Sequence, residues 1–464
     1  MELDPILLSR IQFAFVVSFH AIFPVFTIGL ASYIAVLEGL SLRTRNPVWE
    51  RLSRFWVQVF AVVFGMGVVS GIVMAFQFGT NWSNFSQASA NFLGPVLSYE
   101  VVTAFFLEAA FLGVLLFGRG KVPQSIHFLS AVMVAVGTFI SSFWILSANS
   151  WMQTPGGVEL RDGAFFVTSW LDAIFNASLW PRFFHMALAS FLTGAFVVSG
   201  VSAWYLLRKR DTEIHKKALS MSLWLILFIA PAQVVVGDLH GLNTLENQPV
   251  KVAAMEGHWE RQEGAPLLLF AIPDQENQTN RFEVGIPKLA SFILTQDWEG
   301  EVPGVTDVAP EEQPPVWIVF WSFRIMVALG LLMVFYAIAG LVLRRHEAYA
   351  RKPWFLKSLQ YMAFTPFIAV LAGWFVTEVG RAPWLVYELI DYSAGITPAL
   401  TGGMALFTLI GYVVVYALVF AAGTYYLMRV IKSGAPGEDD LVQSDQQRPK
   451  RPFSAASTAL EEEV

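Results

Sequence analysis

Cysteine is absent from the 464 residues of this chain. Disulfides, cysteine-ligated iron–sulfur clusters and a c-type haem attached through C-x-x-C-H are therefore excluded. Any bound iron must be held by histidine, methionine or carboxylate side chains. Charge is also scarce, because only 14% of the residues are charged, whereas a soluble domain has about 25%. No basic patch with interleaved aromatic residues is present, so we expect no nucleic-acid partner.

Apolar residues are abundant instead: 55% of the chain is hydrophobic, and it contains 40 Phe and 16 Trp. Runs of about 20 apolar residues can cross a bilayer, and such runs predict about nine transmembrane helices here. The runs cover residues 13–37, 55–78, 96–117, 126–146, 184–207, 219–237, 317–343, 361–379 and 403–428. A β-barrel would show short alternating segments. The predicted fold class is therefore an all-α polytopic membrane protein surrounded by lipid.

Basic residues alternate between the predicted loops. They cluster after the first, third, fifth and seventh runs, and they are sparse after the second, fourth and eighth. The clusters contain Arg43, Arg45, Arg51, Arg54, Arg119, Lys121, Arg208, Lys209, Arg210, Lys216, Lys217, Arg344, Arg345, Arg351, Lys352 and Lys357, whereas the poor loops contain Arg161, Arg182 and Arg381. The positive-inside rule then predicts a periplasmic N-terminus and a cytoplasmic C-terminus.

The pattern divides the chain into four parts. Residues 1–238 carry the first six predicted helices, and residues 317–432 carry the last three. Between them, residues 239–316 form one long polar insert that faces the periplasm, and an insert of this length in a compact protein is usually functional or disordered. Residues 433–464 are polar and are predicted to be a disordered cytoplasmic tail.

Ionisable side chains inside the apolar runs are the strongest functional signal, because each costs several kcal/mol in lipid unless it has a partner or a task. They are His20, Glu100, Glu108, His185, Arg324 and Glu378. The predicted topology gathers His20, Glu100, His185 and Glu378, together with Met326, in the outer half of the membrane. Histidine, methionine and carboxylate are groups that can bind iron, so this gathering suggests redox cofactors.

Each of these residues also has a simpler interpretation. His185 could cap a helix start, and His20 could bond a carbonyl group that Pro24 leaves free. Met326 could be ordinary core filler, and Glu378 could form an interfacial ion pair with Arg381. Two acidic residues in one span, Glu100 and Glu108, instead suggest a proton path or a cation site.

The number of candidate ligands separates the redox architectures. A haem–copper oxidase needs about six membrane histidines, whereas the interior of the apolar runs offers His20 and His185. The paired histidines of a bc-type cytochrome b are absent as well. Two histidines with one Met and one Glu could supply axial ligands for about three haems, two of them with an open position for O₂. A transporter with Glu100 and Glu108 as coupling sites, or a cytochrome that passes electrons to a partner protein, remain alternatives.

Several segments together resemble subunit I of the cytochrome bd-type quinol oxidases, over essentially the whole folded length. They are LSRIQFAFVVSFHAIFP, FGTNW, LSYEVVTAFFLEAAFLG, WILSANSWMQ, GDLHGLNTLENQPVKVAAMEGHW, FWSFRIM and GWFVTEVGRAPW. The resemblance implies a multi-pass subunit of the bacterial inner membrane that oxidises quinol on the periplasmic side. It also implies that O₂ is reduced to water with cytoplasmic protons, so that a proton motive force arises without a pump.

The resemblance assigns cofactors to individual residues. His185 and Met326 would ligate the low-spin haem b558, and Arg324 would lie at that haem's charged edge. His20 and Glu378 would ligate the two high-spin haems, b595 and d, and which ligand takes which haem stays open. Arg381, from the same motif as Glu378, is counted with the cofactor-binding residues.

The resemblance assigns the remaining roles as well. Glu100 would lie at the high-spin pair, Glu108 further along the proton path, and Trp374 between haems. Lys251 and Glu256 match the quinol-site residues. The insert resembles the short-loop branch, which includes cyanide-insensitive oxidases, so a b-type haem in place of haem d is the alternative. A second hydrophobic subunit (subunit II) is expected as a partner, and a small single-span accessory subunit is a further one that the resemblance allows.

Overall fold

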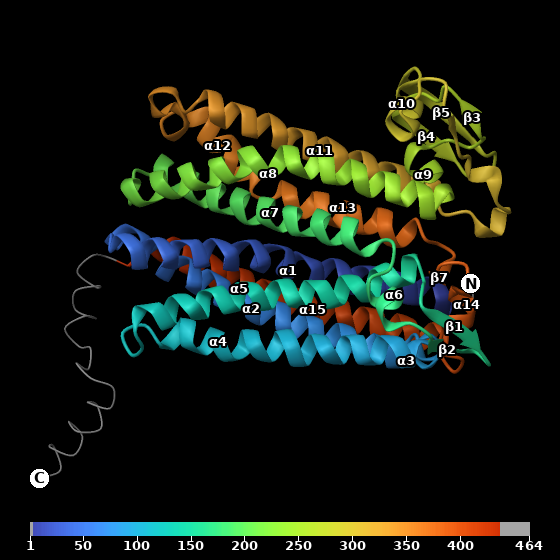
Figure 1. Cartoon of the computed structure of the whole chain (residues 1–464), viewed down its shortest axis with the longest axis horizontal. Coiled ribbons are helices and arrows are strands. Elements are labelled where there is room, and N and C mark those ends of the chain that lie inside the picture. Colours follow the sequence, from blue (N-terminus) through green and yellow to red (C-terminus); the bar gives the residue numbers. More distant parts are fainter. Residues whose placement is uncertain (1–2, 437–464) are drawn as a thin grey trace, which may run out of the picture.

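A computed structural model describes residues 3–436 of the chain (Figure 1). Nine segments of these residues are helical, long enough and apolar enough to cross a membrane, as the sequence predicts. They are α1 (Pro5–Thr44), α2 (Pro47–Thr80), α3 with η1 and α4 (Ser83–Glu100, Val101–Phe105, Phe106–Phe117), α5 (Gln124–Gln153), α6 with α7 (Trp170–Ile174, Leu179–Leu207), α8 (Thr212–Asn247), α11 (Val316–Val342), α12 with α13 (Pro353–Met362, Thr365–Val379) and α15 (Gly402–Ser433). The helices run side by side along one long axis.

The first two helices show how the sequence sets helix ends. The Asp4 side chain accepts a hydrogen bond of 2.8 Å from the amide of Ile6, and Pro5 occupies the first turn of α1. Both features favour a helix start, because the cap satisfies a free amide and proline lacks one. α1 ends where Arg45 adopts a left-handed conformation, and Asn46 immediately caps α2. The first loop is therefore very short, which makes α1 and α2 antiparallel neighbours.

α1 is the most central of the helices, since it packs against α2, α5, α7, α13 and α15. Its contact with α7 is close because Gly29 and Gly194 face each other. A Cβ atom at Gly29 would lie 2.1 Å from the carbonyl oxygen of Ser190, so only glycine fits there. Small residues at such crossings let membrane helices pack through their backbones. α15 lies at the edge and exposes most of its side chains.

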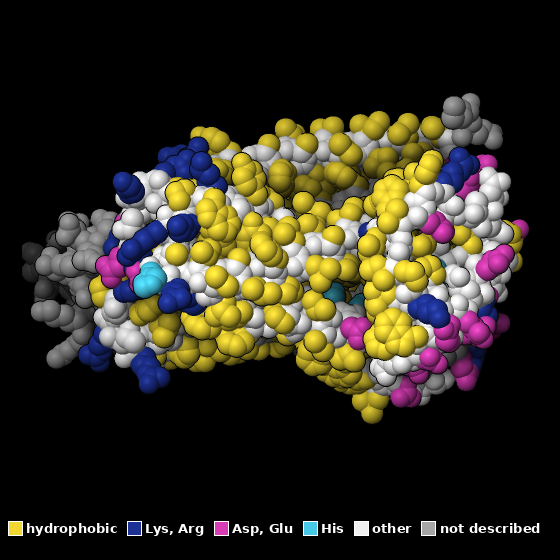
Figure 2. Space-filling model, turned by 90° about the horizontal axis from the view of Figure 1, so that it is seen from above, with side chains coloured by type: hydrophobic (Ala, Val, Ile, Leu, Met, Phe, Trp, Pro, Cys, Tyr) yellow, Lys and Arg dark blue, Asp and Glu magenta, His cyan; other side chains and the backbone are white. Residues whose placement is uncertain are grey.

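The two ends of the bundle differ in charge and structure. We call the end that carries Pro5 and residues 248–315 the loop end, and the end that carries Thr44 and Ser433 the tail end. Lys and Arg gather around the tail end, whereas most Asp and Glu visible in Figure 2 lie over the loop end. From this distribution of charge, the positive-inside rule predicts that the tail end lies in the cytoplasm.

The loop end contains short helices and four two-stranded antiparallel sheets. The sheets pair β1 (Val158–Arg161) with β2 (Ala164–Val167), β3 (Gln262–Glu263) with β6 (Glu301–Val302), β4 (Leu267–Asp274) with β5 (Thr279–Ile286), and β7 (Trp384–Val386) with β8 (Ile390–Asp391). The helices there are α9 (Pro249–Glu256), α10 (Leu289–Thr295), α14 (Tyr392–Gly395) and the 3-10 turns η2 (Val305–Asp307) and η3 (Pro310–Glu312), whereas η4 (Arg345–Ala350) lies at the tail end.

Several helices continue beyond the predicted apolar runs. A helix can extend into the polar membrane surface, where its residues are no longer apolar and hydropathy no longer marks it. α8 reaches Asn247 and so enters the segment 239–316 that the sequence assigns to the loop. The longer helices bring His215 and His240 into the spanning helices, besides His20 and His185. Of the predicted tail, residues 437–464 lie outside the described part of the chain, and Ser433 still belongs to α15.

One buried ionic cluster at the tail end is not predicted by the sequence. Glu38 of α1 is fully buried and forms an ion pair with Arg119. The oxygen that pairs with Arg119 also accepts a hydrogen bond from the Ser53 hydroxyl of α2, and the other carboxylate oxygen lies 3.0 Å from Nδ1 of His127 on α5. The cluster therefore joins three helices and the α4–α5 turn, and these contacts offset the cost of burying the charge.

Candidate functional site

Two acidic residues of the third span face α5. Glu108, in the first turn of α4, is buried, and its Oε1 atom has no hydrogen-bond partner among the described residues. Gly137 of α5 gives it room, because a Cβ atom there would lie 2.5 Å from Cγ of Glu108. Glu100 accepts a hydrogen bond of 2.7 Å from the hydroxyl of Ser141. The two carboxylates therefore meet adjoining turns of α5.

A π-helical turn, η1, separates these two carboxylates. It spans Val101–Phe105, directly after Glu100 and shortly before Glu108. Such π-bulges insert an extra residue into a helix and occur frequently at functional sites. The extra residue changes the helical phase between Glu100 and Glu108, which lie eight residues apart. Both side chains still face α5.

Glu378, at the end of α13, lies in a network of polar side chains. Its Oε1 atom accepts hydrogen bonds from Asn149, at 2.8 Å, and from Gln153, at 3.4 Å. Its Oε2 atom pairs with Arg381 at 2.6 Å. The ion pair considered from the sequence is therefore present. Both amide donors come from the last turns of α5, so α5 reaches Glu378 as well as the two acidic residues of the third span.

Lys251 of α9 points into the helix bundle. Its side chain is buried, and Nζ donates hydrogen bonds of 2.6 Å to Gln153, 2.5 Å to Gln248 and 3.1 Å to the Thr377 carbonyl group. Burial holds the pKa of Lys251 well below its usual value, and the nearby Arg182 and Arg381 lower it further while Glu378 opposes them. The ammonium group thus belongs to the surroundings of Glu378.

Positive charge exceeds negative charge around Glu378. Arg182, Lys251 and Arg381 are all buried, and Glu378 is the carboxylate that acts on each of them. Nε of Arg182, Nη1 of Arg381 and Nε1 of Trp374 are buried without an acceptor among the described residues. Buried donors are nearly always bonded in native proteins, so this cluster has unfilled capacity for an anionic group.

Sequence reasoning missed Arg182 as a site residue, since it counted Arg182 in a loop. Arg182 lies instead in the first turn of α7, three residues before His185 and on the same face of the helix. That spacing was the available signal. Sequence reasoning also missed the polar stripe of α5, which consists of Ser141, Asn149 and Gln153 with Gly137. These positions are separated by multiples of four residues, and residues four positions apart lie on nearly the same face of a helix.

His185 faces α8. Both of its ring nitrogens lie 3.3 Å from Nε2 of Gln233, and a Cβ atom at Gly237 would lie 3.2 Å from its Cε1 atom. The ring of His240 lies 5.5 Å away between centroids, and its Nε2 atom has no partner in the described part of the chain. His240 escaped the sequence analysis because it follows the end of the apolar run.

The other two candidate iron ligands also face a glycine. A Cβ atom at Gly373 of α13 would lie 3.0 Å from the sulfur of Met326, and one at Gly71 of α2 would lie 3.0 Å from Cε1 of His20. The ring of His20 also bonds Ser70 at 2.9 Å. α7 and α11, which carry His185 and Met326, both pack against α8 and α13. Among the described residues, no group of three or more His, Asp or Glu side chains forms a metal site.

Glu256, the last residue of α9, pairs with Arg324 of α11 at 2.8 Å. The same guanidinium group donates to the Leu268 carbonyl oxygen at 2.6 Å and to that of Met255 at 3.3 Å. Arg324 thus connects α9 and β4 of the loop to a spanning helix. Lys251 and Glu256 share one short helix, but their charged groups have different partners: Lys251 reaches α5 and α13, and Glu256 reaches α11.

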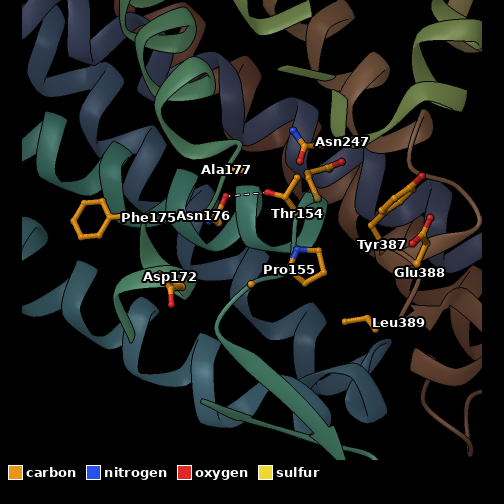
Figure 3. Close-up of a pocket in the computed structure, with 12 residues that line it drawn as sticks. Thr154, Pro155, Asp172, Phe175, Asn176, Ala177, Asn247, Tyr387, Glu388 and Leu389 are labelled. Atoms are coloured by element: carbon orange, nitrogen blue, oxygen red, sulfur yellow. Dashed lines mark hydrogen bonds between the residues drawn. The ribbon is translucent and has the colours of Figure 1, made fainter. Parts of the chain in front are cut away.

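A cavity of about 560 Å³ lies at the loop end. Figure 3 shows Thr154, Asn247, Tyr387 and Glu388 around it. Burial and then the neighbouring Glu388 raise the pKa of Tyr387 to about 12, so its hydroxyl group stays neutral. Gln153 also lines the cavity. Because Gln153 bonds both Lys251 and Glu378, the cavity borders directly on their network.

Comparisons with known proteins show which proteins the chain is similar to. The chain is 35% identical to the cytochrome bd ubiquinol oxidase subunit 1 of Bacillus subtilis, over 93% of this chain and 95% of that protein. It is 31% identical to the cytochrome bd-II ubiquinol oxidase subunit 1 of Escherichia coli, over 93% and 97% of the two chains. It is also 28% identical to a putative cytochrome bd menaquinol oxidase subunit I of B. subtilis, over 94% and 99%.

A solved structure and a family model extend the likeness to the fold. A chain from the structure of the bd oxidase from Geobacillus thermodenitrificans superimposes with a TM-score of 0.87 and 30% identity, covering 93% of this chain and 99% of that one. The family model described as cytochrome bd terminal oxidase subunit I matches residues 8–435. With its nine apolar helices, this chain belongs to the family of cytochrome bd terminal oxidase subunit I, whose members are multi-pass proteins of the bacterial inner membrane.

Proposed function

We propose that this chain is the haem-bearing subunit I of a bd-type quinol oxidase, which oxidises quinol at the loop end and reduces O₂ to water. The observation that carries the proposal is the buried cluster of Arg182, Lys251 and Arg381 around one carboxylate, Glu378. Buried cations are costly unless anions accompany them, and haem propionates are such anions. The names of the relatives, which specify ubiquinol or menaquinol, support a quinol as the substrate.

The donor set fits haem. His185 and Met326 would hold the low-spin haem b558, with Arg324 at its charged edge. His20 and Glu378 would hold the two high-spin haems, b595 and either d or a b-type haem in its place. The glycines that face His20, His185 and Met326 leave space beside these side chains. When bound, the haems carry electrons from quinol and offer the open iron position that O₂ needs.

Arg381 and Trp374 would complete the cofactor surroundings. Each has a buried N–H group without an acceptor among the described residues, and propionate oxygens would satisfy both. Trp374 lies four residues before Glu378 on α13 and therefore on the same face. That position suits the place between haems that the resemblance implies for Trp374.

Quinol would be oxidised beside Glu256 and Arg324. A carboxylate at this place can accept a proton from a quinol hydroxyl group, and the Arg324 guanidinium, held by carbonyl oxygens of α9 and β4, keeps the carboxylate in position. We place the loop end in the periplasm, because the basic residues cluster at the tail end. Protons released from quinol would then leave to the periplasm.

The protons that O₂ reduction consumes would come from the cytoplasm along α5. Glu108 and Glu100 are the carboxylates on this route, and Ser141 and Asn149 are the next polar groups toward Glu378. Charge would be separated across the membrane because the two proton reactions occur on opposite sides, without a pump.

The bd oxidase family works with a second subunit and with quinol and O₂. Subunit II would complete the oxidase, and a small single-span subunit and bound lipid are further partners under this proposal. Membership of the short-loop branch, with low cyanide sensitivity, also stays a prediction.

A dithionite-reduced minus oxidised optical spectrum of the purified complex, with haem extraction, tests the proposed function. Both b- and d-type bands are the expected result. Bands of b type alone would keep the oxidase but place a b-type haem at the O₂ site. A complex without haem would overturn the proposal.

Replacing Met326 with leucine tests the low-spin ligand. The exchange keeps the volume of the side chain and costs less than about 1.5 kcal/mol of stability in a core, so the helix should stay folded. We expect the low-spin b558 bands to be lost, as in His185→Ala, while the high-spin bands remain. Met333→Leu on the same helix, where the methionine is buried in the apolar core, serves as the control. An unchanged spectrum in M326L would rule out Met326 as a ligand.

Adding one methyl group at Gly137 tests the proton path. A Cβ atom there would collide with Glu108, and displacement of a reacting group by about 1 Å can cost about 10²-fold in rate. We expect Gly137→Ala to slow O₂ uptake by up to that factor while the haem spectrum stays intact. Gly113→Ala, on α4 with nothing within 4 Å of the added atom, should behave like the unmodified complex. Equal rates in both variants would remove Glu108 from the path.

A further inference from the structure

The hairpin of β4 and β5 has two different faces. On one face, Leu268 and Ala271 are buried together with Phe320 of α11. On the other face lie large apolar side chains without a cover, among them Phe270 and Val284, whose exposed fractions are 41% and 58%. Further exposed apolar residues of the hairpin are Leu269, Ile272, Phe282 and Ile286.

The strand register of the hairpin shows which side chains share a face. Ile286 pairs with Leu267, and Val284 pairs with Phe270. Directly paired residues lie on the same face of a sheet, so these four apolar side chains share one face. Arg281 follows at the turn end of the hairpin, beyond an irregularity of the register, and its charge is paired with Asp274.

The apolar face continues into the lipid-facing surface of a spanning helix. The ring of Phe270 lies 5.2 Å from that of Trp321 on α11, in an edge-to-face arrangement. Trp317 and Ile318, in the first turn of the same helix, are exposed. Tryptophan is enriched where membrane helices meet the lipid headgroups, so Trp317 and Trp321 mark the depth of the membrane surface beside the hairpin.

The arrangement of the whole loop agrees with this depth. In Figure 1, β4, β5 and α10 project past α11 to one side of the bundle, over the space that lipid would occupy. In Figure 2, hydrophobic side chains line the edge of the loop that faces the length of the bundle, and Asp, Glu, Lys and Arg lie on the opposite edge. α10 adds two half-exposed apolar residues, Phe292 and Ile293.

We propose that the apolar face of the β4–β5 hairpin rests in the lipid headgroup and acyl-chain boundary at the loop end of the bundle. Lipid is the occupant that the observations favour, because the face is continuous with the apolar surface at the start of α11, where Trp317 and Trp321 lie. Interfacial elements bind membranes through such an apolar face with a charged opposite side. A two-stranded hairpin is at best marginally stable in water by itself, so lipid would also stabilise this one.

The anchored hairpin has a consequence for the quinol site, which rests on the function proposed above. The Leu268 carbonyl oxygen of β4 accepts a hydrogen bond from Arg324, the partner of Glu256. A hairpin held at the membrane surface therefore holds this pair at the depth where a lipid-dissolved quinol arrives.

The absence of cysteine from this chain makes the test direct. Single cysteines at Phe270 or Val284 are introduced into the complete oxidase, which is labelled with an environment-sensitive fluorophore and reconstituted into phosphatidylcholine vesicles. The matched control is Glu283→Cys, an exposed position directly before Val284 on the same strand. The unsubstituted complex gives the background from any cysteine of a second subunit.

We expect labels at 270 and 284 to emit at shorter wavelength than the label at 283. Nitroxides on the lipid acyl chains should quench the first two, and aqueous iodide should quench the third. Equal quenching by iodide at all three positions would overturn the proposal. Protection at 270 and 284 from both quenchers would also overturn it, since a protein partner would then cover the face. The readout needs neither quinol nor turnover, so it is independent of whether the proposed function holds.

Discussion

Replacing Glu378 with alanine is expected to remove one high-spin haem, so that extraction yields about two haems per complex instead of about three, and to abolish O₂ reduction. The carboxylate is the candidate iron ligand on α13, and alanine cannot replace it. The change also leaves Arg381 buried without its partner at 2.6 Å, which costs about 3–5 kcal/mol when a buried pair is broken. Haem extraction, optical spectra and O₂ uptake of the purified complex measure these losses.

A double variant separates the ligand role from the ion pair. Replacing both partners of a buried pair with apolar residues is often neutral for stability, so Glu378→Leu with Arg381→Leu should fold at least as well as E378A, and leucine cannot bind iron. If Glu378 binds iron, the double variant still lacks the haem. If Glu378 serves only to neutralise Arg381, the double variant regains all haems, and the ligand assignment falls.

The features that hydropathy controls could be predicted from the sequence. About nine spans were expected and nine are found among residues 3–436, because burial in lipid demands long apolar runs. The ionisable residues inside those runs were also recognised, since their cost in lipid makes them conspicuous. Glu100 and Glu378 accept hydrogen bonds from side chains of α5, and Glu108 faces Gly137 of the same helix.

The partners themselves could not be predicted, because they are small polar residues that a membrane helix tolerates at little cost. Ser141 carries no charge and does not interrupt the apolar run 126–146, and Asn149 and Gln153 follow the end of that run while α5 continues. His240 and Arg182 lie just beyond the ends of runs, where hydropathy falls while the helix continues. The packing of the whole bundle decides which side of a helix contacts which neighbour. The sequence of a single helix does not contain this information.

The directions of the charged side chains on α9 could not be predicted from the sequence either. Lys251 and Glu256 lie five residues apart in the sequence, and the family resemblance assigns both to the quinol site. In the folded chain, Lys251 bonds Gln153 and Gln248 inside the bundle, and Glu256 bonds Arg324 toward the loop. α9 therefore lies between two polar networks, and each network contains one of the two charges.

Replacing Glu256 and replacing Lys251 should consequently impair the oxidase in different ways. Glu256→Gln keeps the shape of the side chain but removes the proton acceptor, and general bases contribute about 10²–10⁴-fold to rates. We expect quinol-dependent O₂ uptake to fall by at least about 10²-fold, with all haems retained. Lys251→Met removes a buried cation beside Glu378 and Gln153, so we expect it to alter the high-spin spectrum and haem content. Optical spectra and O₂ uptake of both variants, measured on the same preparations, provide the comparison.

An artificial one-electron donor that bypasses quinol sharpens this comparison. With that donor, O₂ uptake by E256Q should return to the rate of the unmodified complex, because its haems are intact, whereas K251M should remain impaired. Glu260→Gln, an exposed carboxylate just after α9, controls for loss of charge in the loop and should be neutral in both assays. If E256Q oxidised the natural quinol at the rate of the unmodified complex, Glu256 would not belong to the quinol site. A K251M complex with an unchanged high-spin spectrum and a defect limited to quinol would place Lys251 with quinol after all.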